Sequence, residues 1–181
     1  SKKKLACAWR ERQLKLWLVL VTLLPPRRND YAYLCLGTTS TPEAITLIVD
    51  ADGLPTKLVF SRESVSKKRQ RVDRASVGFD LSVYTDVRDS LQQFISTADE
   101  PLTYGQPLFK SKRGGPPFSS AARCLRWLET LLSKELGGKP VSMNSVRHAA
   151  INLVESLPPT VRTINLRRGV ASAMSHSLAT A

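Results

Sequence analysis

The chain has few residues that could hold a metal ion or form a disulfide framework. Its 181 residues include three cysteines and two histidines. Cys7, Cys35 and Cys124 are odd in number, far apart and flanked mostly by apolar residues, and no Cys-x-x-Cys pair or Cys/His cluster occurs. We therefore expect no zinc site, and we expect three buried thiols in a reducing compartment.

The sequence also lacks a long hydrophobic run. Its longest apolar stretch, Leu14 to Leu24, contains Lys15 and Thr22 and is well short of the roughly 20 residues that a spanning helix needs. Because no small-residue cleavage site follows, it does not read as a signal peptide. We expect no membrane segment, and a first residue of Ser1 suggests that the sequence begins within a longer protein.

Acidic residues are in short supply. Fifteen Asp and Glu stand against 27 Lys and Arg, which gives a net charge of +12. Such a chain attracts polyanions, and nucleic acid is the leading partner, although a membrane surface or a ribosome would suit the same charge. Charge therefore selects a class of partner and not an activity. The length fits one domain with a real hydrophobic core.

Hydrophobic periodicity and turn signals predict a mainly helical α+β fold. The runs 45–49 and 58–60 read as a hairpin around Asp50-Ala51-Asp52-Gly53, and a third run at 77–81 completes a small three-stranded antiparallel sheet. About six helices are expected, with Ser119 or Ser120 as the cap of one and Ser142 as the cap of another. They are placed at 5–24, 28–36, from 84 onward, 119–137, 142–158 and 161–174.

Two segments in the first half of the chain suit phosphate chemistry. Leu24-Pro25-Pro26-Arg27-Arg28-Asn29-Asp30-Tyr31 places Asp30 one helical turn after Arg27. A guanidinium can fork two oxygens of one phosphate, and the carboxylate can hold it, although solvated arginines at a helix start give the same pattern. The second segment is the loop 62–74 between the last two expected strands, and it carries Lys67, Lys68, Arg69 and Arg71.

Two further segments lie near the C-terminal end. Residues 141–150, Val-Ser-Met-Asn-Ser-Val-Arg-His-Ala-Ala, contain Asn144, Arg147 and His148 at the head of an expected helix. Met174-Ser175-His176-Ser177 follows the last expected helix. A Pro-Leu-Phe at 107–109 precedes a Gly/Pro-rich link between the second and third segments.

In this order, the four segments resemble those of the catalytic domain of tyrosine site-specific recombinases, the phage-integrase family. The resemblance covers nearly the whole chain and implies the recombinase catalytic fold. It also implies cleavage and rejoining of DNA strands through a 3′-phosphotyrosine intermediate, with neither a metal nor a nucleotide cofactor. The implied partners are duplex DNA and other copies of the protein, as a tetramer on paired sites, in an intracellular, DNA-associated location.

The resemblance assigns a role to each candidate residue. Arg27, Arg147 and His176 would hold the phosphate, Lys67 or Lys68 would protonate the leaving oxygen, and Asp30 and His148 would support them. Asn144 stands where the family most often has histidine; it can donate a hydrogen bond but cannot act as a base. Residues expected to contact DNA are Arg28, Arg69, Arg71, Lys112 and Arg113.

In the family the nucleophilic tyrosine follows the histidine by about nine residues, so we expect it beyond Ala181, and residues 1–181 to be a catalytic domain truncated before it. Tyr31, Tyr33, Tyr84 and Tyr104 lie in the wrong segments. A DNA-binding domain before residue 1 is expected from the family alone. Two alternatives stay open: a type IB topoisomerase-like enzyme, and a non-catalytic DNA-binding remnant of a recombinase.

Overall fold

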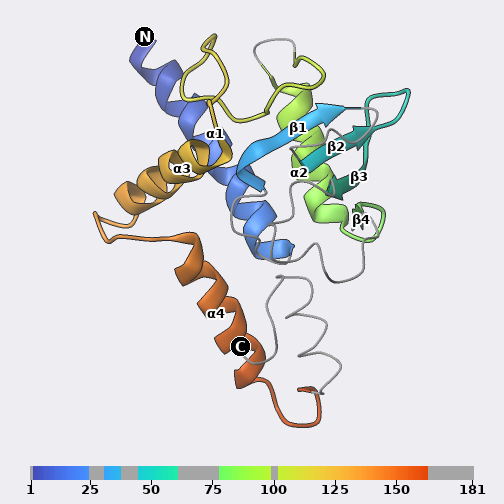
Figure 1. Ribbon diagram of the computed structural model, residues 1–181, viewed down its shortest axis with the longest axis vertical. Helices are drawn as coiled ribbons and strands as arrows, with labels where there is room; N and C mark the ends of the chain where they lie inside the picture. The colour runs from blue at the N-terminus through green and yellow to red at the C-terminus, as the bar shows by residue number, and fades with distance from the viewer. Residues whose placement is uncertain (1, 25–30, 38–44, 61–77, 99–101, 163–181) are drawn as a thin grey trace.

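The structure is a computed structural model that describes residues 2–24, 31–37, 45–60, 78–98 and 102–162 (Figure 1). These ranges form an α+β fold with four α-helices and a four-stranded mixed sheet. The elements in chain order are α1 (Lys2–Leu23), the 3-10 helix η1 (Tyr31–Tyr33), β1 (Leu34–Gly37), β2 (Ile45–Val49), β3 (Pro55–Phe60), β4 (Gly78–Asp80), α2 (Thr85–Ser96), α3 (Ala121–Glu135) and α4 (Met143–Ser156).

The sheet has the strand order β1-β2-β3-β4. The predicted hairpin is confirmed: β2 and β3 pair antiparallel, and the Asp50 carboxylate closes their turn by accepting the backbone N–H groups of Asp52 at 3.0 Å and Leu54 at 2.8 Å. The third predicted run is β4, which pairs antiparallel with β3. The prediction of a three-stranded, wholly antiparallel sheet is wrong, because β1 adds a fourth strand parallel to β2.

That extra strand replaces part of an expected helix. We placed a helix at 28–36, whereas residues 31–33 form one 3-10 turn and Leu34 begins β1. Every residue of β1 is buried, and a continuous apolar run of this kind cannot be told from a buried helix by its periodicity. The segment 105–108 covers the β1 edge, with Leu108 N–H donating to Leu34 O at 2.8 Å and Gly105 N–H to Leu36 O at 2.7 Å.

Helix α1 lies at the centre of the molecule, between α3 on one side and α2 with the sheet on the other (Figure 1). Its buried stripe runs through Trp9, Gln13, Leu16, Trp17 and Leu20, which repeat at helical spacing. Apolar residues of the sheet, α2 and α3 join this stripe in one hydrophobic core. The helical and sheet regions therefore share a core, which supports a single domain over the described residues.

The remaining helices follow their sequence signals. Helix α2 buries Val87, Leu91 and Phe94 as one stripe. Of the two cap candidates before α3, Ser120 is the cap, since its Oγ accepts Arg123 N–H at 3.3 Å. The cap predicted at Ser142 is confirmed, since its Oγ accepts Ser145 N–H at 3.2 Å. The last expected helix, 161–174, lies outside the described residues beyond position 162, so the expected total of about six helices becomes four α-helices within the described ranges.

One cysteine departs from its expected environment. Cys35 and Cys124 are buried, and desolvation raises the pKa of the Cys35 thiol to about 11 and that of Cys124 still further. Cys7 is exposed, because it lies on the opposite face of α1 from Trp9 and Leu16. Its Sγ contacts Glu11 Oε1 at 3.2 Å, and this hydrogen bond raises the pKa of the thiol.

Candidate nucleic-acid interface

Five of the candidate residues lie within the described part of the chain. Asn144, Arg147 and His148 belong to α4, and Lys112 and Arg113 to the loop before α3. The others fall outside the described residues. They are Arg27, Arg28, Asp30, Lys67, Lys68, Arg69, Arg71 and His176.

The first turn of α4 is fixed to α3 by polar contacts. Met143 N–H donates to Glu129 Oε1 at 2.6 Å, and Val141 N–H donates to Ser133 Oγ at 3.1 Å. Met143 is buried in the core, and Ser142 caps the helix. Glu129 thus satisfies one of the N–H groups that a helix start leaves open, and its negative charge suits that end of the helix dipole.

Two candidate side chains are exposed on α4. Asn144 and His148 are four residues apart, so they lie on the same broad face of the helix, one turn from each other. The backbone of Arg147 is in the second turn of α4. An amide and an imidazole are therefore open to a ligand on this face, and each can donate a hydrogen bond to an anionic oxygen.

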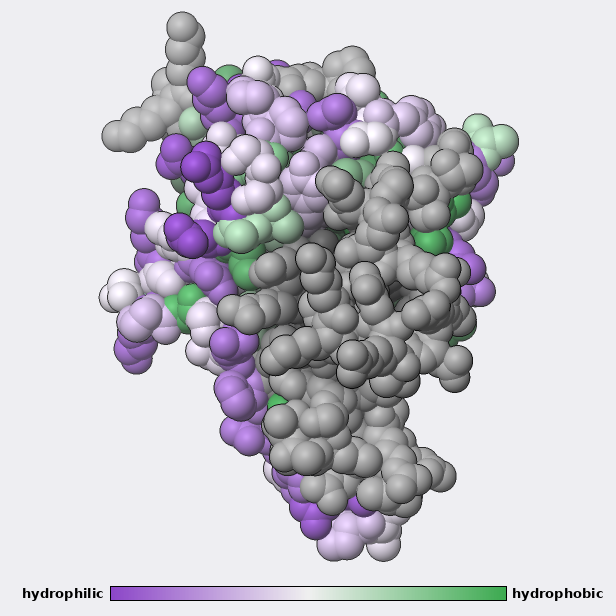
Figure 2. Space-filling model, viewed as in Figure 1, coloured by the Kyte–Doolittle hydropathy of each residue, from purple (hydrophilic) through white to green (hydrophobic). Residues whose placement is uncertain are grey.

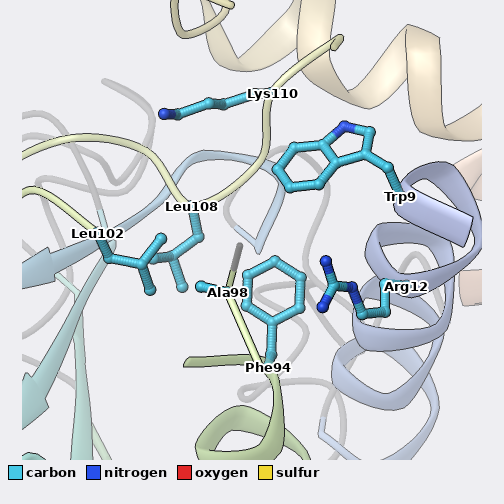
Figure 3. Close-up of a pocket in the computed structure, with 7 residues that line it drawn as sticks. All are labelled: Trp9, Arg12, Phe94, Ala98, Leu102, Leu108 and Lys110. Atoms are coloured by element: carbon cyan, nitrogen blue, oxygen red, sulfur yellow. The ribbon is translucent and has the colours of Figure 1, made fainter. Parts of the chain in front are cut away.

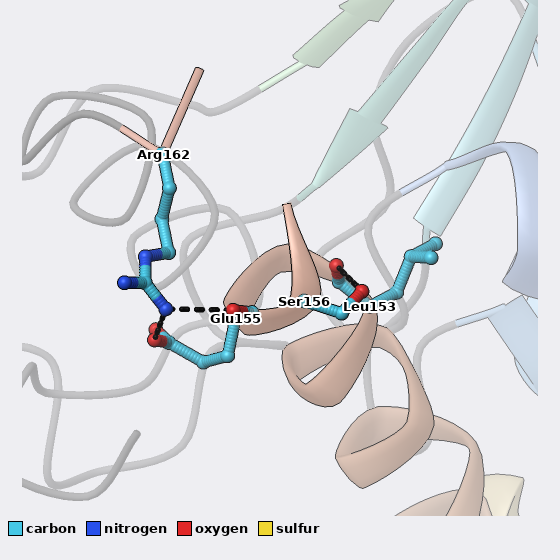
Figure 4. Close-up of polar contacts among 4 residues, drawn as sticks. All are labelled: Leu153, Glu155, Ser156 and Arg162. Atoms are coloured by element: carbon cyan, nitrogen blue, oxygen red, sulfur yellow. Dashed lines mark hydrogen bonds and ion pairs between the residues drawn. The ribbon is translucent and has the colours of Figure 1, made fainter. Parts of the chain in front are cut away.

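The other end of α4 is closed by local contacts (Figure 4). The Arg162 guanidinium donates to the backbone oxygen of Glu155 at 2.6 Å and lies 3.2 Å from Glu155 Oε2. Ser156 Oγ donates to Leu153 O at 2.7 Å. Helix α4 ends at Ser156, just before Pro158, where the sequence signal predicted it to stop.

The loop before α3 is built on a buried glutamine of α1. Gln13 is fully buried; its Nε2 donates to Lys110 O at 2.9 Å and its Oε1 accepts Lys110 N–H at 2.7 Å. An isolated antiparallel bridge between Lys110 and Pro117 then closes the loop. At its base, Phe118 packs on Trp127 of α3 with ring centroids 5.3 Å apart. Both groups of the Lys110 backbone are thereby paired, which fixes the start of the loop.

The tip of the loop is a tight turn. Gly115 N–H donates to Lys112 O at 3.1 Å, and Gly114 has a φ of 66°, as a type II turn requires at its third position. The Lys112 side chain packs over Gly115 so closely that an added Cβ there would meet Lys112 Cγ at 2.6 Å. Lys112 and Arg113 are exposed at this tip.

Sequence reasoning missed several residues of this region. Lys110, Arg123 and Arg126 were not singled out; the two arginines are exposed and three residues apart on α3. Gln13 was also missed, although a glutamine within an apolar helical stripe is a signal of a buried hydrogen bond. Hydrophilic side chains cover most of the described surface in Figure 2, and the hydrophobic ones there are scattered. That surface suits a polar partner more than an apolar one.

Two small hollows lie beside each other among the described residues. The first lies between α1, α2 and the loop, has a volume of about 10 Å³ and holds no more than one water molecule (Figure 3). It is lined by Trp9, Arg12, Phe94, Ala98, Leu102, Leu108 and Lys110. The second, of about 190 Å³, lies beside it along 102–117. Both are smaller than the roughly 300 Å³ that small-molecule sites usually reach.

Within the described ranges, no group of three or more His, Cys, Asp or Glu side chains is arranged to hold a metal ion. None of the described helices is both long enough and apolar enough to cross a lipid bilayer. Comparisons with protein-family models, with curated proteins and with solved structures find no match to this chain.

Proposed function

We propose that this chain is the catalytic domain of a tyrosine site-specific recombinase, which breaks and rejoins duplex DNA through a 3′-phosphotyrosine link. The observation that carries the proposal is the order of the four segments around Arg27, Lys67-Lys68, Arg147 and His176. An α+β fold with a basic run between two antiparallel strands and an arginine in a capped helix is consistent with it.

The described elements next to these segments support the proposal. Leu24 and Tyr31, which flank the Arg27 segment, are both buried in the core, and η1 packs against α3. The α4 helix, which carries Arg147, is attached to the same α3 through Glu129 and Ser133. Helix α3 therefore connects the two arginine segments, as a shared phosphate site would require.

In the proposed mechanism, Arg27, Arg147 and His176 donate to the non-bridging oxygens of the scissile phosphate. Their charge stabilises the pentavalent phosphorane, which is the largest contribution that such donors make. A tyrosine outside residues 1–181 attacks the phosphorus through its phenolic oxygen and loses the phenolic proton to solvent, while the P–O5′ bond breaks and the 5′ oxygen takes a proton from Lys67 or Lys68. The phosphotyrosine keeps the energy of the broken phosphodiester bond, so that the strand can be rejoined without a nucleotide.

The four tyrosines of the chain differ in exposure, and Tyr33 is half-buried in η1. Tyr31 is fully buried, and Tyr84 is half-buried and packs edge-on against Phe79 with ring centroids 5.7 Å apart. Tyr104 is exposed, but it lies in the loop that covers the β1 edge and not near α4 in sequence. The fully buried Tyr31 phenol cannot reach a DNA phosphate without unfolding of the core.

The test uses a nicked suicide substrate that carries the recombination site of the element encoding this protein. We expect the 181-residue chain to bind this DNA and to leave it uncleaved, because donors can stabilise the phosphorane but cannot supply the attacking oxygen. The same reading frame extended by about 20 residues should give a DNA-linked band on a denaturing gel. A tyrosine-to-phenylalanine change in the extension should remove that band.

A covalent band from the 181-residue chain would overturn the assignment of the nucleophile, and phenylalanine variants of Tyr31, Tyr33, Tyr84 and Tyr104 would identify the residue responsible. A second function is favoured by one residue: Asn144 occupies the position where the family most often has histidine, and it cannot handle a proton. In that case the protein is a non-catalytic DNA-binding remnant, and the extended chain would bind DNA without forming a covalent link. Relaxation of supercoiled plasmid without any paired site would instead indicate a type IB topoisomerase-like enzyme.

A further inference from the structure

The loop between Lys110 and Pro117 is basic, and its backbone is held by hydrogen bonds. It carries Lys110, Lys112 and Arg113 within four residues and contains no acidic residue. Lys112 and Arg113 are exposed, and the tip that bears them is a hydrogen-bonded turn. Figure 1 shows this loop, in yellow, projecting beside α1.

Its rigidity comes from contacts on three sides. Gln13 pairs with both backbone groups of Lys110, the Lys110–Pro117 bridge closes the loop, and Phe118 on Trp127 holds its base on α3. A loop ordered before binding loses less conformational entropy on binding, which increases affinity without any added contact. Because buried Gln13 fixes the Lys110 backbone, the loop differs from an unanchored cationic segment.

We propose that the loop 110–117 is a contact site for the phosphodiester backbone of duplex DNA, and that Gln13 is the positioning residue that holds it in place. This inference rests on the proposed function. It adds to that function a specific surface outside the four catalytic segments and a residue that sets its geometry. Phosphate contacts of this kind position a protein on DNA without reading its sequence.

A duplex fits the loop better than an anionic membrane does. The exposed tip is made of Ser111, Lys112, Arg113 and Gly114, and none of these offers an apolar side chain to insert among lipids. Surface binding to membranes combines cations with buried apolar groups, whereas phosphate contacts on DNA require only donors and charge. An Arg and a Lys side by side supply those donors to neighbouring phosphates.

The experiment measures binding of the 181-residue chain to a 30-base-pair duplex of arbitrary sequence, by fluorescence anisotropy across a series of NaCl concentrations. Five proteins are compared: the parent, Lys112→Ala/Arg113→Ala, a matched control Lys57→Ala/Arg88→Ala on the sheet and α2, Gln13→Met, and Gln13→Met combined with Lys112→Ala/Arg113→Ala. The control removes the same two charges from another surface. Circular dichroism melting confirms that each protein is folded.

We expect the parent to bind with an affinity that falls steeply with salt, and Lys112→Ala/Arg113→Ala to reduce the log–log slope by about 1.8, since each lost phosphate contact removes about 0.9. The control should keep the parent slope. Gln13→Met should weaken binding in the parent and add nothing in the Lys112→Ala/Arg113→Ala background, because its effect acts through those side chains. A purely structural role would weaken both backgrounds equally and would overturn the positioning assignment.

The remaining outcomes separate this inference from the proposed function. If the parent binds DNA and the two double variants behave alike, the loop proposal fails while the recombinase proposal stands. If the parent does not bind duplex DNA at low salt, both proposals fail. Stronger binding to vesicles of phosphatidylserine and phosphatidylcholine than to the duplex would show that the loop's partner is a membrane surface. If Gln13→Met does not fold, the paired double variants still decide the contact site.

Discussion

Among the described residues, the helical side and the sheet side differ in the sign of their charge. On the sheet side, residues 45–60 and 78–98, the aspartates Asp50, Asp52, Asp80, Asp86 and Asp89 outnumber Lys57 and Arg88. On the helical side, which comprises α1, the 102–120 loop and α3, three glutamates are outnumbered by cations. Those cations are Lys2, Lys3, Lys4, Arg10, Arg12, Lys15, Lys110, Lys112, Arg113, Arg123, Arg126 and Lys134.

Several sheet-side aspartates have local structural partners. The Asp50 carboxylate closes the β2–β3 turn, and Asp89 pairs with Arg88 at 3.0 Å. Asp80 accepts Ser82 N–H at 2.9 Å, and its hydrogen bonds with Ser82 lower the pKa of the Asp80 carboxyl. Within the described residues, cations are therefore concentrated on α1, the 102–120 loop and α3, and this part of the molecule attracts a polyanion. The basic residues of 61–77, which follow β3 in sequence, lie outside this comparison.

The largest expected effect concerns whether the two sides are one folding unit. Trp17 is fully buried in the α1 stripe that contacts both sides, so Trp17→Ala should lower the free energy of unfolding by about 3–5 kcal/mol. We expect a single transition, because sheet, α2 and α3 share one core. Urea unfolding, followed by tryptophan fluorescence and by far-ultraviolet circular dichroism, measures both the free energy of unfolding and the number of transitions.

Trp17→Phe is the matched control. In the described part of the chain the Trp17 Nε1 is buried without a hydrogen-bond partner, so phenylalanine removes an unsatisfied donor and should cost less than alanine. Two separate transitions in the alanine variant, with the sheet side unfolding at the parent's urea concentration, would show that the two sides are independent domains.

The next effect separates binding from chemistry. Under the proposed function, Arg147→Ala in the chain extended through its tyrosine should lower the cleavage rate by about 10²-fold or more, since a transition-state donor is lost. The affinity for DNA should stay within a few-fold of the parent, because Arg147 is one cation beside the many that the helical side supplies. Single-turnover cleavage and anisotropy measure the two quantities on the same duplex.

The control for this prediction is Arg162→Ala. That arginine lies on the same part of the chain but contacts Glu155, so cleavage should be unchanged by its loss. Cleavage by Arg147→Ala within a few-fold of the parent would mean that the second arginine has been misassigned.

Much of the fold could be predicted from the sequence because its signals are local. Ser120 and Ser142 cap helices through their own hydroxyls, and Asp50 and Gly53 set a hairpin turn within five residues. The strand β1 could not be predicted, because its partners are β2 and the segment 105–108, which lies some 70 residues away in sequence. Only long-range pairing distinguishes this buried strand from a buried helix.

The candidate site likewise contains local features that could be predicted from the sequence and long-range contacts that could not. The pattern of Arg147 and Asn144 at a capped helix start could be predicted, since cap and motif are neighbours in sequence. The two hydrogen bonds between Gln13 and the Lys110 backbone could not be predicted, because the residues are 97 positions apart and neither is unusual alone. Glu129, which fixes the start of α4 from α3, was missed for the same reason.

The smallest expected effect tests whether α4 belongs to the helical side or forms a unit of its own. Figure 1 shows α4 leading away from α3, and its described side chains are mostly exposed after Met143 and Val146. Loss of a serine cap costs about 1 kcal/mol. Ser142→Ala should therefore raise hydrogen-exchange rates of α4 amides about fivefold, which is 1 kcal/mol of local opening, and leave the global free energy of unfolding nearly unchanged.

Ser120→Ala is the matched control, because Ser120 caps α3 in the same way, and α3 buries Cys124, Leu125, Leu128 and Leu132 in the shared core. There the same loss of about 1 kcal/mol should appear in the global free energy of unfolding, since α3 cannot open without exposing that core. Hydrogen exchange by mass spectrometry and urea unfolding are measured on both variants. Equal shifts in global stability would mean that α4 unfolds together with the core. In that case the arginine it carries is held by the whole domain and not merely by the contacts of Met143 and Val141 with α3.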